Sequence, residues 1–163
     1  MKKIDHYFVL IQLLGFLFFG IDRFLKGNIL SANSERELFS LDGYRILFSR
    51  YLNSDMAFSL PFPVWLIIGV TLVILGILMK YLLRSWQKRE FALIAFQSLI
   101  IWGAFSNLWD RLVYGAVVDY VLVELPFFKW PVFNVADGMV VMGVLSAGLV
   151  YFWQSTSINK KRG

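Results

Sequence analysis

Four long apolar stretches dominate this chain and leave few folds open to it. They cover about residues 7–25, 63–83, 91–109 and 132–153. Each comes close to the roughly 20 residues that an α-helix needs to cross the hydrocarbon core of a bilayer. Because 58% of the 163 residues are hydrophobic, a water-soluble domain of this size could not bury its apolar surface. We therefore expect an α-helical membrane protein with four transmembrane helices, organised as a single membrane domain over residues 1–163.

The first stretch could be mistaken for a signal peptide, because Lys2 and Lys3 precede its apolar run. It lacks a cleavage site of small residues, and Asp22 and Arg23 end it instead. We therefore expect an uncleaved membrane anchor.

Basic residues predict which connections face the cytoplasm. They gather at the two termini and between the second and third stretches, namely Lys2, Lys3, Lys80, Arg84, Lys88, Arg89, Lys160, Lys161 and Arg162. The positive-inside rule places all three clusters in the cytoplasm. Both termini are then cytoplasmic, and the connections 26–62 and 110–131 lie outside. Topology thus accounts for the net charge of +5, and we expect no nucleic-acid partner.

The first outer connection is too long for a simple turn. Its segment ELFSLDGYRILF, residues 37–48, places Asp42-Gly43 between two short runs with β-strand propensity. An Asp-Gly pair in this setting predicts a β-hairpin with a type I′ turn. We expect a small extracytoplasmic β-rich insert over about residues 27–62, with an ordinary loop as the alternative.

Polar residues interrupt the apolar sequence at one membrane depth, near the outer surface. Asp22 and Lys26 are four residues apart at the end of the first stretch, so they share a helix face. Asn134 and Asp137, three apart, share a face at the start of the fourth. The others close or follow the third stretch: Asn107, Asp110, Arg111 and Asp119.

Each of these residues also has a purely structural explanation. Asp22 and Lys26 can form an interfacial ion pair, and Asn134 can cap a helix. Arg111 can extend to lipid headgroups or neutralise Asp137. However, a carboxylate in a membrane helix costs roughly 2.5–3.5 kcal/mol at the helix centre and usually marks function. Asp119 and Asp137 flank one short outer connection, so they can face each other.

Two facing carboxylates can hydrolyse a peptide bond without further groups. When the two groups lie about 3 Å apart, they cannot both be ionised, so they share one proton. The ionised group deprotonates a water, and the protonated group assists the scissile carbonyl and the leaving amine. This chemistry suits a chain with no Cys and a single His, which excludes thiol nucleophiles and His-based triads or metal sites. We expect no cofactor and no catalytic metal.

A carboxylate pair could instead bind a cation, as in a small multi-span carrier. A carrier needs polar residues through to the cytoplasmic side. Only Gln12 and Gln97 interrupt the inner halves of the stretches, and no acid accompanies them. This disfavours transport.

Sequence blocks around these residues resemble the lipoprotein signal peptidase (signal peptidase II) family, which are aspartic intramembrane peptidases of bacteria. The segment NLWDRLVYGAVVDY, residues 107–120, is similar to the family's Asn-x-x-Asp-Arg…Gly-x-Val-x-Asp-Phe block. FNVAD, residues 133–137, is similar to its Phe-Asn-x-Ala-Asp block. DRFLK at 22–26 and NSDMAF at 53–58 resemble two weaker elements.

The resemblance implies a β-cradle and an outer helix around the site. It also implies cleavage of prolipoproteins just before a lipid-modified Cys, in the bacterial cytoplasmic (inner) membrane. By motif position, Asp119 and Asp137 would be the catalytic dyad. The supporting or substrate-binding residues would be Asp22, Lys26, Asn53, Asn107, Arg111 and Asn134. The expected partners are lipid-modified prolipoproteins and membrane lipids, the expected state is a monomer, and the alternative is a catalytically silent relative that binds lipidated peptides.

The chain departs from the family pattern at five positions, and these bear on the substrate entrance and on backbone conformation. Arg23 stands where Gln is usual, Leu25 where Thr or Ser is usual, and Tyr120 where Phe is usual. Ser106 and Asp55 each replace a Gly.

Overall fold

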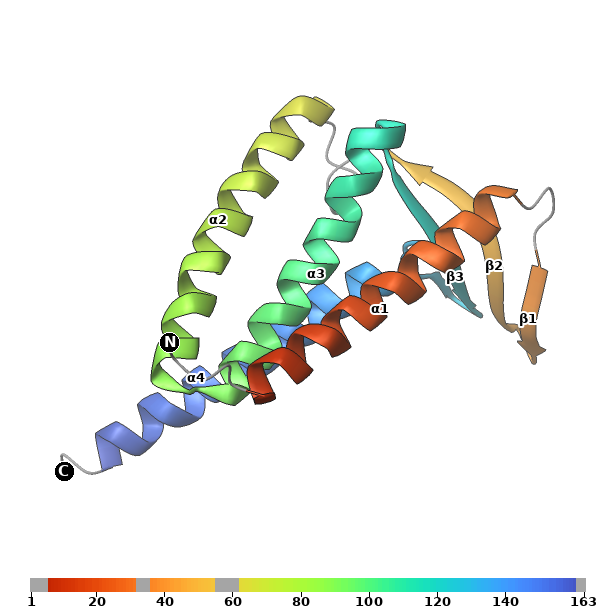
Figure 1. Cartoon of the computed structure of the whole chain (residues 1–163). Coiled ribbons are helices and arrows are strands. Elements are labelled where there is room, and N and C mark those ends of the chain that lie inside the picture. The colour runs from red at the N-terminus through yellow and green to blue at the C-terminus, as the bar shows by residue number, and fades with distance from the viewer. Residues whose placement is uncertain (1–5, 32–35, 55–61, 161–163) are drawn as a thin grey trace.

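The computed structural model describes residues 6–31, 36–54 and 62–160, with side chains as far as Trp153. Its helices are α1 (His6–Ser31), α2 (Val64–Lys88), α3 (Phe91–Tyr114) and α4 (Val135–Lys160). Its strands are β1 (Arg36–Leu41), β2 (Tyr44–Asn53), β3 (Val117–Leu125) and β4 (Phe128–Lys129). All four helices are long and apolar enough to cross a membrane, which confirms the prediction of four transmembrane helices. Figure 1 shows the sheet at one end of the helix bundle.

Helix α3 is the centre of the bundle, because it packs against α1, α2, α4 and β3. Close approach of helix backbones in a membrane needs small residues at the contact. A Cβ atom added to Gly103 would lie 2.5 Å from the carbonyl oxygen of Ala136, and one added to Gly143 would lie 2.7 Å from that of Phe96. These two glycines therefore let α3 and α4 meet backbone to backbone.

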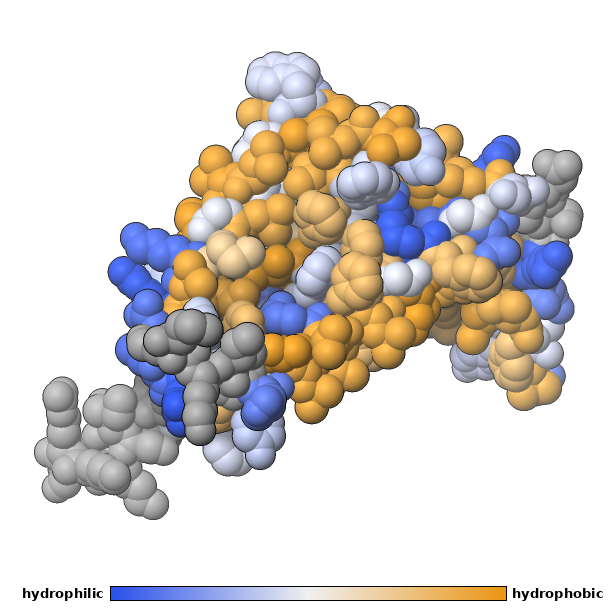
Figure 2. Space-filling view, in the orientation of Figure 1, coloured by the Kyte–Doolittle hydropathy of each residue, from blue (hydrophilic) through white to orange (hydrophobic). Residues whose placement is uncertain are grey.

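The outside of the bundle is apolar, as expected for a surface that faces lipid. Figure 2 shows hydrophobic residues along most of this face, with hydrophilic residues concentrated toward its two ends. The buried interior at the sheet end contains Ile29, Val118 and Tyr120, packed against neighbours that include Leu25. This cluster joins the C-terminal end of α1 to β3.

The sheet is antiparallel with strand order β1-β2-β3-β4. Leu41 pairs with Tyr44 across a two-residue loop, in which Asp42 and Gly43 have φ of 46° and 84°. Positive φ at both central residues is the mark of a type I′ turn, so the hairpin prediction is confirmed. The ordinary-loop alternative is wrong.

Two expectations about the outer connections need correction. The first insert does not begin at 27, because α1 continues to Ser31. The sheet is also not confined to 27–62, since β3 and β4 come from the second outer connection. Four successive residues of β3, Val117 to Tyr120, are buried, so this strand lacks the alternating pattern that reveals a half-exposed strand. The implied outer helix does not occur in the described parts of these connections, and Asp55 lies outside the described residues.

Candidate active site

Asp119 and Asp137 come from two elements that meet at the sheet end of the bundle. Asp119 lies in β3 and is 2% exposed, whereas Asp137 lies half-buried in the first turn of α4. Asn134 connects them. Its side-chain amide donates to Oδ1 of Asp119 at 2.6 Å, its backbone N–H donates to Oδ2 of Asp137 at 3.1 Å, and its Oδ1 accepts from the Asp137 N–H at 2.8 Å.

Two further asparagines complete the contacts of this pair. The amide of Asn53, at the end of β2, donates to Oδ2 of Asp119 at 3.0 Å. The amide of Asn107, in α3, donates to Oδ1 of Asp137 at 2.7 Å. Each of the four carboxylate oxygens thus accepts one hydrogen bond and keeps lone-pair capacity for a water or a substrate.

The environment of Asp119 favours its protonated form. Burial, and then the negative charge of Asp137, raise the pKa of Asp119 to about 6. The hydrogen bonds from Asn53 and Asn134 and the charge of Lys26 act in the opposite direction but do not cancel the shift. A carboxyl group with this pKa can hold a proton near neutral pH.

Lys26 lies close to this pair, deep in the protein, and is 1% exposed. Its ammonium is 2.8 Å from Oδ2 of Asp22 and 2.7 Å from Oδ2 of Asp110. It also donates to Oδ1 of Asn107 at 3.0 Å. Because Asn107 bonds to Asp137, this buried charge cluster is directly coupled to the carboxylate pair.

Sequence reasoning missed four members of this cluster. Asp110, at the end of the third apolar stretch, is one of them, and it accepts from the N–H of Val118, the residue before Asp119, at 3.2 Å. The departures Arg23, Ser106 and Tyr120 bond to the buried acids as well. Arg23 pairs with Asp110, and Ser106 and Tyr120 donate to Asp22. The sequence indicated them only in that each carries a polar group and stands directly next to a residue of the expected site.

Arg111 lies half-buried near the end of α3, where its charge interacts with Asp137, Asp119 and Asp110. The structure therefore brings together all eight residues selected from the sequence. Among the residues that the structure describes, no group of three His, Cys, Asp or Glu side chains could hold a metal ion. Carboxylates, amides and buried cations are the chemistry that this site offers.

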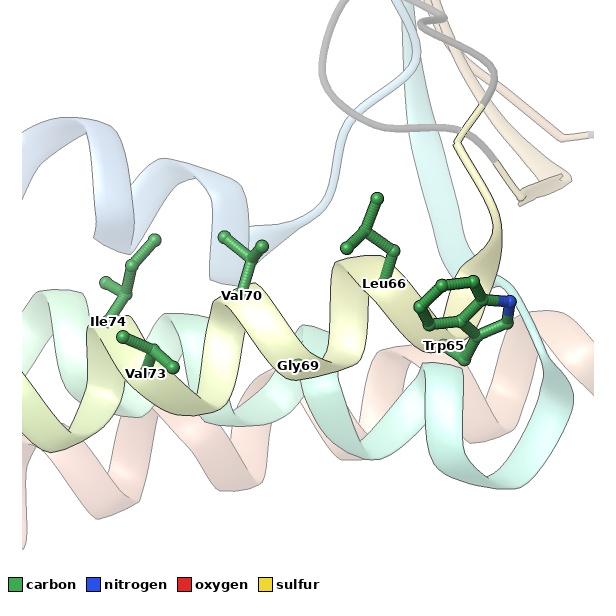
Figure 3. A pocket seen from close by; sticks show the side chains of 6 residues that line it. All are labelled: Trp65, Leu66, Gly69, Val70, Val73 and Ile74. Carbon is green, nitrogen blue, oxygen red and sulfur yellow. The ribbon is translucent and has the colours of Figure 1, made fainter.

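An apolar groove on α2 is separate from these residues. Figure 3 shows its lining along one side of that helix: Trp65, Leu66, Gly69, Val70, Val73 and Ile74. None of the described residues that line it is acidic or basic. These six residues are not groups for proton transfer.

Comparison with known proteins identifies the family. A family model described as signal peptidase (SPase) II matches residues 14–153, most of the chain. The chain belongs to the signal peptidase II family. The matched residues include Asp119, Asp137 and Asn134 and end before residues 154–160 at the C-terminal end of α4.

Two curated members of the signal peptidase II family illustrate the similarity. The lipoprotein signal peptidase of Brucella ovis is 38% identical over 102 residues, which cover 60% of this chain and 60% of the relative. That of Pseudoalteromonas atlantica is 30% identical over 96 residues, which cover 59% of this chain and 58% of the relative. The matched segment thus spans about three fifths of the length of these relatives.

Solved structures share the fold of this chain. A structure described as a bacterial membrane enzyme aligns with a TM-score of 0.73 and 19% identity, covering 96% of this chain and 93% of its own. A second, with the same description, aligns with a TM-score of 0.68 and 20% identity over 92% and 95% of the two chains. The arrangement of four helices and a sheet is therefore shared.

Proposed function

We propose that this protein is an aspartic endopeptidase of the membrane that cleaves signal peptides from lipid-modified prolipoproteins, immediately N-terminal to the diacylglyceryl-cysteine. The observation that carries this proposal is the Asp119–Asn134–Asp137 arrangement at the sheet end of the bundle. Family membership supports it, because the curated relatives are named lipoprotein signal peptidases.

In the proposed reaction, Asp119 and Asp137 share one proton. The ionised carboxylate removes a proton from a water, whose oxygen attacks the scissile carbonyl carbon. The protonated carboxyl donates a hydrogen bond to the carbonyl oxygen. The C–N bond then breaks as the amine nitrogen takes a proton from the dyad. Because the two carboxyl groups share one proton, the roles of acid and base are assigned to the dyad and not to one fixed residue.

The supporting residues would keep this pair in place and limit its negative charge. Asn53, Asn107 and Asn134 hold the carboxylate oxygens by the hydrogen bonds given above. Lys26 and Arg111 bring positive charge close to the dyad. Asp22 orients Lys26 through their ion pair.

The substrate would be a membrane-tethered prolipoprotein that enters laterally from lipid, because the site lies beside spans whose outer surface is apolar. We propose that the protein acts as a monomer in the bacterial cytoplasmic (inner) membrane. The carrier alternative is less well supported. Gln12, one of the two glutamines of the inner halves, bonds to Ser98 and Trp102 and so ties α1 to α3.

The direct test incubates the purified protein with a diacylglyceryl-modified prolipoprotein and follows the released signal peptide by mass spectrometry. The same prolipoprotein without its lipid serves as the matched control. We expect cleavage before the modified Cys of the lipidated form. Binding of the lipidated form without cleavage would instead identify a catalytically silent relative.

The proposed orientation has its own test, because the chain contains no Cys and any introduced thiol is unique. Ser40 lies exposed in β1 and Gln87 lies exposed near the end of α2. We predict that Ser40→Cys reacts with a membrane-impermeant thiol reagent in intact cells (spheroplasts if there is an outer membrane) and that Gln87→Cys reacts only after lysis. The reverse pattern would place the site in the cytoplasm and contradict the proposed substrate.

A further inference from the structure

The start of α4 uses partners from two other elements, α1 and β3, to satisfy its backbone. The first N–H groups of any helix lack acceptors within the helix. Asn134 and Asp137 satisfy two of them reciprocally, because each side chain accepts from the backbone N–H of the other. The N–H groups of Val135 and Ala136 remain to be paired.

Tyr120 and Asp22 pair these two N–H groups. The N–H of Val135 donates to the hydroxyl oxygen of Tyr120 at 3.1 Å, and the N–H of Ala136 donates to Oδ1 of Asp22 at 3.3 Å. The Tyr120 hydroxyl in turn donates to the same Asp22 oxygen at 2.9 Å. Tyr120 is 1% exposed, so bulk water does not compete for these bonds. One hydroxyl group therefore links β3, α1 and the first turn of α4.

Ser106 fixes the other oxygen of Asp22. Its hydroxyl donates to Oδ2 at 2.6 Å, and the Lys26 ammonium is 2.8 Å from the same atom. Asp22 itself is fully buried. With both oxygens engaged, its carboxylate is held in one orientation, with Oδ1 toward the start of α4.

Because Tyr120 is the neighbour of Asp119 in the chain, its hydrogen bonds tie the start of α4 to the strand that carries Asp119. Tyr120 follows Asp119 directly, and successive side chains of a strand point to opposite faces. One face of β3 thus supplies Asp119, while the other supplies the hydroxyl that holds the helix carrying Asp137. We propose that Tyr120, assisted by Ser106, is a positioning residue that sets the placement of Asp137 against Asp119.

This role depends on the hydroxyl and not on the ring. The Tyr120 ring packs against Phe48, with centroids 5.1 Å apart, and Tyr120→Phe keeps that contact. The change removes one acceptor from Val135 and one donor from Asp22. Phe is also the usual residue here in the family block that the sequence resembles, so we expect the variant to fold.

The kinetic test rests on the proposed peptidase activity. Tyr120→Phe should lower kcat about tenfold, because a hydrogen bond that orients a catalytic group is lost. KM should stay within about twofold, because Tyr120 contacts no substrate in this proposal. Ser106→Ala should lower kcat less than Tyr120→Phe does. The fold-loss of kcat in the double variant should be smaller than the product of the two single fold-losses, since both residues act through Asp22. Tyr44→Phe, at a half-exposed Tyr in the hairpin, is the matched control and should behave as wild type.

Hydrogen exchange tests the link between Tyr120 and α4 without an activity assay. In detergent, Tyr120→Phe should speed amide exchange at Val135 and Ala136 and leave the centre of α3 unchanged, whereas Tyr44→Phe should change neither. Wild-type kcat together with wild-type exchange would overturn the positioning role. A fall in kcat of Tyr120→Phe that came with lower thermal stability and with faster exchange throughout the protein would also overturn it. That result would indicate a merely structural role. If the wild type failed to cleave, the proposed function would fail, while the exchange result would still decide whether the hydroxyl anchors α4.

Discussion

Helices α2 and α3 satisfy the same criterion for a membrane span but serve the molecule differently. They have 25 and 24 residues, and both are long and apolar enough to cross a membrane. Helix α3 contacts every other helix and β3, whereas α2 packs chiefly against α3. The buried residues of α3 include Ser98, Gly103, Ser106 and Asp110, while those of α2 are Ile67, Leu82 and Ser85.

The difference shows that hydropathy identifies spans but not their roles. Small and polar residues on α3 create its contacts, because they allow close backbone approach and interhelical hydrogen bonds. Asn107 and Asp110 then extend these contacts into the candidate site. Changes to buried residues of α3, or to the site residues that contact it, should therefore reduce stability or turnover. Matched changes on α2 or on the exposed hairpin should not.

The largest expected effect is on the dyad. Asp119→Asn and Asp137→Asn should each reduce kcat by about 10²–10⁴-fold, because an amide can neither take the proton of a water nor supply one. Cleavage of a lipidated prolipoprotein provides the measurement. Asp42→Asn, the same chemical change at an exposed turn residue whose φ of 46° Asn tolerates, is the control. Near-normal turnover in either dyad variant would show that the pair is not the catalytic group.

Removal of the buried cation should be the most damaging change to stability. Lys26→Met would leave Asp22 and Asp110 buried beside each other without the ammonium that both contact. Breaking a buried pair in this way costs roughly 3–5 kcal/mol. Lys80→Met, at an exposed position of α2, should change the free energy of unfolding by less than about 0.5 kcal/mol. Similar unfolding free energies in mixed micelles for the two variants would contradict the contrast between the two helices.

Stability should also fall as pH rises, because of Asp119. Its pKa in the folded protein is raised to about 6, chiefly by burial. The folded state therefore binds more protons than the unfolded state between about pH 4 and pH 6, so the unfolding free energy decreases across that window. The decrease should total roughly 2–3 kcal/mol by pH 7. Asp119→Asn should flatten this part of the pH profile and Asp42→Asn should not, and an unchanged slope in Asp119→Asn would assign it to another group.

The sequence predicted those features that depend on local pattern or on length. The four spans follow from apolar length, the hairpin from Asp42-Gly43, and the facing acids Asp119 and Asp137 from acids placed against apolar sequence. Asn53 is implied only by the family resemblance. The network behind the site could not be predicted, because its partners are remote in sequence. Arg23 and Asp110 are 87 residues apart, and Tyr120 and Asp22 are 98 apart. Strand β3 escaped recognition because its buried run gives no alternation of polar and apolar residues.

Close packing is the feature least visible in sequence, since glycines of α2 and α3 look alike there. An Ala at Gly103 would bring Cβ within 2.5 Å of the Ala136 carbonyl oxygen, whereas a Cβ added to Gly69 or Gly76 of α2 would meet no neighbouring atom within 4 Å. Gly103→Ala must therefore push apart α3 and the first turn of α4, at a cost of about 1–3 kcal/mol in unfolding free energy. Because Ala136 precedes Asp137, kcat should fall as well. Gly69→Ala should retain wild-type stability and turnover, and equal behaviour of Gly103→Ala and Gly69→Ala would show that the close contact between α3 and α4 does not hold the site.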